Sequence, residues 1–160
     1  MNKPLIALFS VLIFAFGCAQ TGERAELSAG NGSGGYGNGI DVPVSLASAE
    51  NSRIAAIEFT VTYDESKVTL NGVAAGTASE NVGKEVSYIK TGVDTAKITI
   101  SGMNQNTFGN GAVALLNFTS TIPNASSAIG ISEVVASDSD GEQIEVSPKI
   151  GSIETTYNSK

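Results

Sequence analysis

Two closely spaced pairs of carboxylates are the side chains in this sequence best suited to catalysis or metal binding. The first pair, Asp64-Glu65, follows an apolar and threonine-rich run. Glycoside hydrolysis needs two acids about 5–10 Å apart across a cleft, one of them with a raised pKa. Adjacent residues at the end of a strand point apart. We therefore expect this pair to begin a turn and not to form a catalytic site.

The second pair lies in Asp138-Ser139-Asp140-Gly141, which has the alternating acids and glycine of a calcium-binding loop. A full loop of that kind spans about 12 residues and closes on a distant Glu. Here the glycine directly follows the second acid and Glu142 comes next, so the spacing is not met. Asp-Gly is a common hairpin signal. The segment therefore predicts a turn, and we expect no metal site.

The composition narrows the chemistry further. The sequence has no histidine and a single cysteine, so zinc sites and cysteine–histidine nucleophiles lack their side chains. Acidic residues outnumber basic ones by 16 to 9, which gives a net charge of −7. Nucleic-acid binding requires a basic patch. We expect a protein that is not an enzyme, holds no cofactor and binds no nucleic acid.

A polar loop carries the side chains that most resemble a sugar-binding site. Its segment Asn104-Gln105-Asn106-Thr107-Phe108 combines amides with one aromatic ring. Such groups bind sugar hydroxyls and apolar sugar faces, but a loop with one buried Phe as its anchor is the interpretation we favour. Carbohydrate binding stays open as the alternative function.

The N-terminus has the form of an export signal. Lys3 precedes an apolar run from Leu5 to Phe16, shorter than the roughly 20 residues of a spanning helix. The run ends in Ala-Phe-Gly-Cys18, which resembles the bacterial lipobox, where the cysteine is lipidated and the peptide is cut before it. We predict a lipoprotein signal over 1–17 and lipid attachment at Cys18. An ordinary secretory signal cut near Ala19 and an uncleaved anchor helix are the alternatives.

A lipid on Cys18 would hold the chain at a membrane of a bacterial cell envelope. Ala19 stands where an Asp often marks inner-membrane retention, and this favours the outer membrane or the cell surface. Residues 18–24 would form a tether, and residues 25–156 are enough for one domain.

Alternating apolar and polar residues predict that this domain is built from strands. The alternation is clearest from Ile57 to Tyr63, and other segments show it at 40–47, 85–90, 96–101, 112–121, 129–136, 142–146 and 150–155. The Gly- and Ser-rich residues after Ala29 predict a loop, Asn71-Gly72 predicts a turn, and Pro43 predicts an edge strand or a bulge. Eight or nine short strands separated by turns indicate an antiparallel β-sandwich.

Several of these motifs, in this order, resemble the cohesin domain. A first strand leads through a glycine turn into Val42-Pro43-Val44, and Phe59 to Asp64 is similar to the cohesin F-x-x-x-Y-D strand. Later matches are the hydrophobic pair and glycine at 68–76, the G-x-G-like and aliphatic-x-Phe strand at 110–118, and a closing hairpin at 136–153. The resemblance covers roughly residues 25–155.

The resemblance implies an all-β, antiparallel jelly-roll sandwich of about nine strands. It also implies a non-catalytic module that docks a protein partner, a calcium-loaded dockerin on a polysaccharide-degrading enzyme. In cohesins the outward face of the Phe59 strand takes part in this recognition, so the partner-binding candidates are Glu58, Thr60 and Thr62. Cellulose-binding modules share the fold, and a carbohydrate-binding module is therefore the alternative.

Overall fold

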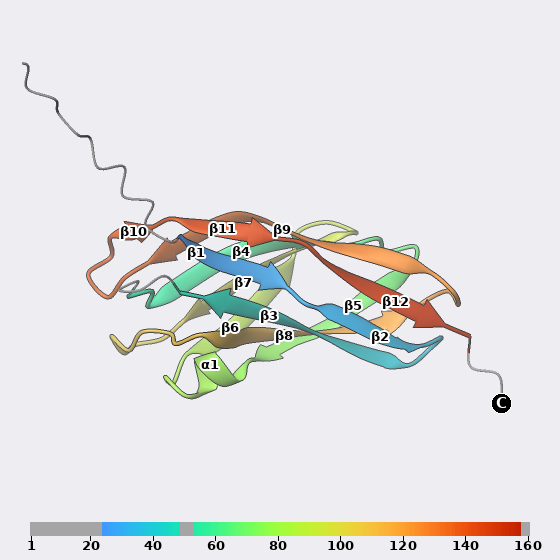
Figure 1. Cartoon of the computed structure of the whole chain (residues 1–160), viewed down its shortest axis with the longest axis horizontal. Helices are drawn as coiled ribbons and strands as arrows, with labels where there is room; N and C mark the ends of the chain where they lie inside the picture. Colours follow the sequence, from blue (N-terminus) through green and yellow to red (C-terminus); the bar gives the residue numbers. More distant parts are fainter. Residues whose placement is uncertain (1–23, 49–52, 158–160) are drawn as a thin grey trace, which may run out of the picture.

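The computed structural model describes residues 24–48 and 53–157, and these form two β-sheets packed face to face (Figure 1). The first sheet has the strand order β11-β1-β3-β8-β5, with bounds Val146–Lys149, Ala25–Ala29, Gly39–Ala47, Gly111–Ser120 and Val68–Ala75. The antiparallel β-sandwich predicted from the alternation is confirmed.

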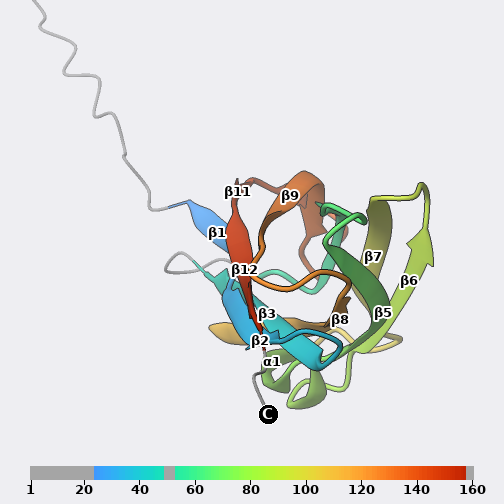
Figure 2. The same ribbon diagram turned by 90° about the vertical axis from the view of Figure 1, so that its right-hand side faces the viewer.

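The second sheet has the order β2-β12-β9-β4-β7-β6. Its strands are β2 (Asn31–Gly35), β12 (Gly151–Thr156), β9 (Ser126–Ser137), β4 (Ala56–Thr62), β7 (Thr95–Ser101) and β6 (Glu85–Lys90). The short β10 (Gln143–Ile144) pairs with β9, and the one helix among the described residues is the single turn α1 (Thr77–Glu80). Figure 2 looks along the sandwich and shows the two layers curling around a shared interior.

The interior is filled by the apolar half of each alternating strand. The largest fully buried side chains come from both sheets and from Ile54 just before β4: Phe59, Phe118, Leu27, Leu46, Ile54, Ile57, Leu70, Ile98, Ile100, Leu116, Ile129 and Ile153. Tyr63 packs edge-on against Phe118, with ring centroids 5.3 Å apart. Because this side of each strand is buried, the register is fixed and the polar residues face outward.

The glycine-rich segment after Ala29 is a strand and not the predicted loop. The chain leaves β1 at Gly30, crosses to the second sheet as β2, and pairs in parallel with β12. A Cβ at Gly32 would lie 2.7 Å from Ile40 Cγ2, and one at Gly34 would lie 2.6 Å from Ile40 Cγ1. The glycines therefore let β2 run close over the side chains of β3. The composition alone predicted a loop because it does not show this close approach.

The predicted turn at Asn71-Gly72 is also wrong, because β5 runs straight through it. The pairing of β5 with β8 shifts between Leu70 and Gly72, so the extra residue makes a β-bulge. Asn71 is held in that bulge by hydrogen bonds from its Nδ2 to Asn117 Oδ1 and Thr119 Oγ1. Contacts along the whole of β8 override the local turn preference.

Pro43 lies inside the first sheet, between β1 and β8, and not at an edge. The structure confirms the alternative of a bulge, since the β3–β8 register shifts between Val44 and Ser45. The pairing of β3 with β1 ends at Val44, where β1 turns away at Gly30. On that side the Pro43 carbonyl accepts a 2.7 Å hydrogen bond from the N–H of Gly30, and the β1 pairing that could have used an N–H at Pro43 goes no further.

Cys18 and the rest of residues 1–23 lie outside the described residues. Within the ranges that are described, none of the helical structure is long or apolar enough to cross a bilayer. The register places Ala25 at the same end as Ala47 and Gly111, and it places Val68, Gly39 and Ser120 at the opposite end. The start of β1 and the β4–β5 turn are thus at opposite ends of the sandwich.

Candidate functional site

The three residues predicted to meet a partner all lie on the outer side of β4, in the middle of the second sheet. Glu58, Thr60 and Thr62 alternate with the buried Phe59 and Val61. The neighbouring strands β9 and β7 lie on either side of β4, and β6 forms the edge. We call the outer surface of these four strands, β9, β4, β7 and β6, the four-strand face.

The register resolves the centre of the four-strand face into rows, two of which cross all four strands and one of which crosses three. One row, from β9 to β6, is Val135, Glu58, Thr99 and Ser87. The next row is Ser132, Thr60, Lys97 and Ile89, and a third at the strand ends is Gly130, Thr62 and Thr95. The face therefore mixes hydroxyls and charges with two apolar side chains, Ile89 and Val135, which are 64% and 52% exposed.

Glu58 is held in place by two neighbours on β7. Lys97 Nζ lies 2.9 Å from Glu58 Oε1, and Thr99 Oγ1 donates to Glu58 Oε2 at 3.1 Å. These hydrogen bonds, led by the one from Lys97, lower the pKa of Glu58, and the same contact raises the pKa of Lys97. Glu58 therefore stays ionised near neutral pH, in a fixed orientation on an exposed surface.

Thr60 lies beneath Glu133, and the sequence did not predict this arrangement. Its side chain is only 8% exposed, and its Oγ1 donates a 2.8 Å hydrogen bond to Glu133 Oε2. Glu133 itself is exposed, so at this position the group presented to solvent is its carboxylate. Thr60 thus orients Glu133, whereas Glu58 and Thr62 keep exposed surface of their own.

Glu133 reaches this position through an unusual backbone. Its φ is +50°, a left-handed conformation that residues with a Cβ rarely adopt. The β4–β9 register shifts between Glu58 and Thr60, so β9 carries a bulge there. The bulge is visible in which positions of β9 are buried: they are odd-numbered at Ile129 and Ile131 but even-numbered at Ala136. That change of phase marks the extra residue.

A shallow hollow lies beside Glu58 on the same face. It measures about 210 Å³ and is lined by Ala56, Ile57, Glu58, Thr99, Ile100, Val135 and Ser137. Its apolar wall and charged rim suit a single apolar side chain from another protein.

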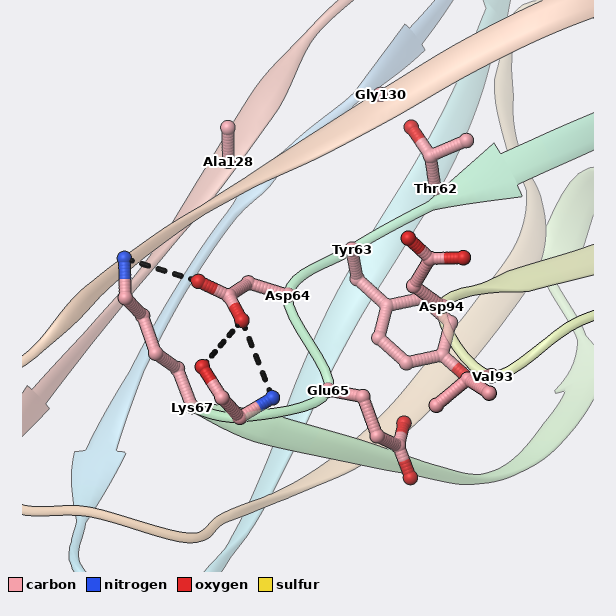
Figure 3. Close-up of a pocket in the computed structure, with 10 residues that line it drawn as sticks. Thr62, Tyr63, Asp64, Glu65, Lys67, Val93, Asp94, Ala128 and Gly130 are labelled. Carbon is pink, nitrogen blue, oxygen red and sulfur yellow. Dashed lines mark hydrogen bonds and ion pairs between the residues drawn. The ribbon is translucent and has the colours of Figure 1, made fainter.

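A larger hollow lies where the four-strand face meets the β4–β5 turn, and Figure 3 shows its walls. It measures about 830 Å³ and is lined by Thr62, Tyr63, Asp64, Glu65, Ser66, Lys67, Val93, Asp94, Ala128 and Gly130. Asp64 is engaged in building the turn: Ser66 donates to it, and Lys67 Nζ lies 3.1 Å from Asp64 Oδ2. These contacts lower the pKa of Asp64 and explain the predicted turn.

The Asp138 segment is the hairpin turn that its spacing predicts. Asp138 Oδ1 accepts hydrogen bonds from the backbone N–H groups of Asp140 and Glu142, and Gly141 has a φ of +85°. Among the described residues, no group of three or more acidic, cysteine or histidine side chains could hold a metal ion.

The loop with amides is held to the sandwich by its buried Phe108, and its two asparagine side chains bond to the neighbouring backbone. Phe108 is 4% exposed, and the Asn104 and Asn106 side chains donate to the carbonyl oxygens of Gly83 and Val82. Lys84 is buried beneath the loop and donates to Asn104 O, and its burial lowers the pKa of the ammonium group. The buried-anchor interpretation is confirmed, and these amides serve the fold.

The exposed tyrosines of the described residues do not line up on a sheet face. Tyr36 and Tyr157 follow the ends of β2 and β12, and Tyr88 lies on the edge strand β6. The Tyr88 hydroxyl donates to Asn71 O across the edge of the sandwich. This arrangement differs from the aligned row of rings expected of a carbohydrate-binding surface.

Comparison with solved structures finds the same fold. A non-cellulosomal cohesin from Archaeoglobus fulgidus has a TM-score of 0.70 at 22% identity and covers 82% of this chain and 91% of its own. The sixth cohesin of scaffoldin B from Acetivibrio cellulolyticus, solved with a mutant Cel5 dockerin, has a TM-score of 0.72 at 23% identity and covers 82% and 99%. A Clostridium thermocellum OlpA cohesin, solved with a dockerin, has a TM-score of 0.70 at 20% identity and covers 82% and 99%.

No curated protein matches the chain. The sequence matches the cohesin domain over residues 25–155, which includes both sheets and the whole four-strand face. This match, over most of the chain, and the shared fold lead to one conclusion: the protein belongs to the cohesin domain family.

Proposed function

We propose that this protein is a lipid-anchored binding module of a bacterial cell envelope, and that it docks a dockerin-bearing protein through the four-strand face. Cohesin domains are non-catalytic modules that bind dockerins, and family membership over residues 25–155 is the observation that carries the proposal. A calcium-loaded dockerin on a polysaccharide-degrading enzyme is the partner we expect.

The four-strand face supports this assignment by its chemistry. Glu58 and Glu133 present oriented carboxylates, and exposed apolar side chains stand near them, Val135 on β9 and Ile89 on β6. A specific contact between two proteins buries roughly 1,200–2,000 Å² and depends on a few well-packed anchors, with charges that steer and orient the partner. A rigid sheet with both kinds of group suits a partner that lies flat on it.

The partner can be tested with the full chain carrying Cys18→Ser, which keeps the protein free of lipid. Immobilised protein is exposed to dockerin modules of the host bacterium, with calcium or with a chelator, and binding is followed by interferometry. Calcium-dependent binding of a dockerin supports the proposal. Absence of dockerin binding, together with retention of the protein on insoluble polysaccharide, would replace it with the carbohydrate-binding alternative.

The lipid anchor rests on the lipobox-like sequence before Cys18 and needs its own test. Mass spectrometry of the mature N-terminus in the host should find a diacylglyceryl group on Cys18 as the first residue. In the Cys18→Ser variant, the same measurement should find no lipid at position 18. An unmodified N-terminus that begins after Cys18 would contradict the anchor and leave the docking proposal untouched.

A further inference from the structure

The strand β6 differs from the three other strands that end a sheet. The first sheet ends in β11 and β5, and the second ends in β2 and β6. β11 has four residues and includes Pro148, β5 is bulged at Asn71, and β2 consists of Asn, Gly and Ser and has no apolar side chain to bury. Short strands, prolines and bulges are features that keep a sheet edge from pairing with another chain.

β6 is regular and open to solvent along its whole length. Its six residues pair with β7 without a register shift, and all of them except Val86 are exposed. Figure 2 shows β6 as the outermost strand on its side of the sandwich. An open edge of this kind is a template for one further strand.

The direction of the β6 backbone groups follows from the turn that joins β6 to β7. Thr91 N donates to Thr95 O at 3.0 Å, so these two residues form a hydrogen-bonded pair. Hydrogen-bonded and non-hydrogen-bonded pairs alternate along an antiparallel ladder, so every second residue from Thr91 back to Glu85 bonds to β7. The residues between them direct their N–H and C=O groups away from β7, and no hydrogen bond within the described part of the chain uses these groups: Val86, Tyr88 and Lys90.

A second copy of β6 matches these groups when it runs antiparallel to the first. A two-fold axis perpendicular to the sheet at Tyr88 pairs Tyr88 with its equivalent and Val86 with Lys90 of the other copy, and it allows about six hydrogen bonds. Moving the axis by one residue would bring Lys84 or Gly92 opposite one of these residues. Both Lys84 and Gly92 already use their N–H groups within their own chain. The axis at Tyr88 is therefore the one that satisfies the whole edge.

The side chains of β6 suit the same arrangement. The strand has its acid at one end, Glu85, and its base at the other, Lys90, so an antiparallel copy brings the acidic end beside the basic end. A parallel copy would bring like charges together, which is unfavourable. In the antiparallel copy the exposed Ile89 lies opposite Ser87 and diagonal to Ile89 of the other copy, and the two Tyr88 rings lie opposite each other.

We infer that β6 pairs with β6 of a second copy of this chain, antiparallel about Tyr88, and joins the second sheets of two molecules into one. One strand from each copy makes a small contact, so the dimer is reversible. Because the axis is perpendicular to the sheet, the two four-strand faces point to the same side and stay uncovered. Their use by two docked partners rests on the proposed function, whereas the pairing of β6 does not.

Cross-linking in cells of the host bacterium tests the pairing. The full chain is expressed with Ser87→Cys, and the matched control is Ser33→Cys, an exposed site on β2 at the other edge of the same sheet. The parent chain, with Cys18 as its only cysteine, gives the background. A short bismaleimide should join two copies through position 87 and not through position 33, as identified by mass spectrometry of the linked peptides. Equal yields from both positions, no dimer through position 87, or a link from position 87 to a different protein would overturn the inference.

A proline tests whether the backbone of the edge makes the contact. In the Ser87→Cys protein, Tyr88→Pro removes an outward N–H and should lower the yield of cross-linked dimer about 10-fold, whereas Tyr88→Ala keeps that N–H and most of the yield. Limited proteolysis checks that each variant is folded, and Lys90→Pro with Lys90→Ala replaces the first pair where Tyr88→Pro is not. Equal yields from the proline and alanine variants would overturn the inference. No dockerin enters this experiment, so a failure of the proposed function leaves its result unchanged.

Discussion

The two outer faces of this sandwich come from the same alternating pattern, but they differ in how their polar groups are paired and in how much apolar surface they expose. On the first sheet, exposed polar groups satisfy one another: Asn117 Nδ2 donates to Asp41 Oδ1, and Asn71 Nδ2 donates to Asn117 Oδ1 and Thr119 Oγ1. We call this the amide face. On the four-strand face, carboxylates are oriented by their neighbours but keep exposed surface, and two large apolar side chains are exposed beside them.

This difference is the reason we propose docking on the four-strand face and not on the amide face. Removing water from the amide face would gain little, because none of the large apolar side chains found exposed in the described residues lies on it. Covering Ile89 and Val135 would bury apolar surface, at about 25 cal/mol per Å². Alternation of polar and apolar residues predicts an outer face, but the pairing of groups across strands decides what that face can bind.

The largest effect is expected from a charge placed at the apolar edge of the four-strand face. Val135→Glu should weaken dockerin binding by about 100-fold, since it puts an unpaired charge beside Glu58 in a contact that excludes water. Its matched control is Ala74→Glu, an exposed site on β5 in the amide face, which should bind normally. Equal losses in both variants, measured by interferometry, would show that the faces do not differ in function.

Glu58→Ala should have a smaller effect on binding, about 10-fold, because an exposed charge mainly orients a partner. The melting temperature should hardly change, since the ion pair with Lys97 is on the surface. An unchanged dissociation constant would remove Glu58 from the site.

The same residue gives the four-strand face a pH-dependent contribution to stability. The pKa of Glu58 is lowered from 4.5 in the folded state, so its contacts stabilise the protein above pH 4.5 and this contribution is lost as the pH falls through the lowered value. Urea unfolding of the parent protein and of Glu58→Gln should therefore differ more at about pH 7 than at about pH 3. A difference that grows at low pH would contradict the assignment.

Two substitutions of Glu133 distinguish the effect of its left-handed backbone from the effect of losing its carboxylate. Glu133→Gly and Glu133→Ala both remove the carboxylate, but glycine adopts the left-handed φ of +50° without strain. The glycine variant should be more stable than the alanine variant by about 1 kcal/mol in urea unfolding. Equal stabilities would mean that the bulge in β9 relaxes when the carboxylate is lost.

Asn117→Ala should have the smallest effect. It breaks the hydrogen bonds to Asp41 and Asn71 on the amide face, which are exposed, and should lower the free energy of unfolding by about 0.5–1 kcal/mol. Dockerin affinity should stay the same. Weaker binding by this variant would place the partner on the first sheet.

Much of the fold was predictable because the alternation of apolar and polar residues shows which side chains of each strand are buried. Phe59, Val61 and Ile57 are all buried, as the alternation in their segment predicts, and the polar residues between them face outward. The resemblance to the cohesin domain that these motifs indicate is confirmed. The position of Glu58 and Thr62 on an outer face followed from the same period of two.

The predictions that were wrong concern segments whose structure depends on contacts with residues far away in the chain. The loop predicted after Ala29 is a strand because Gly32 and Gly34 let it approach Ile40, and the turn predicted at Gly72 is a bulge because β8 pairs along all of β5. Glu133 was missed because its placement over Thr60 comes from a register shift between β4 and β9. Local preferences do not contain these pairings.

The most direct test of the docking assignment is to map a bound dockerin on the two faces by methyl NMR. With saturating dockerin and calcium, the methyl signals of Ile89, Val135 and Thr62 should shift or broaden, while those of Ala74, Leu115 and Thr119 on the amide face stay in place. The reverse pattern, with changes confined to Ala74, Leu115 and Thr119, would contradict the assignment of the four-strand face.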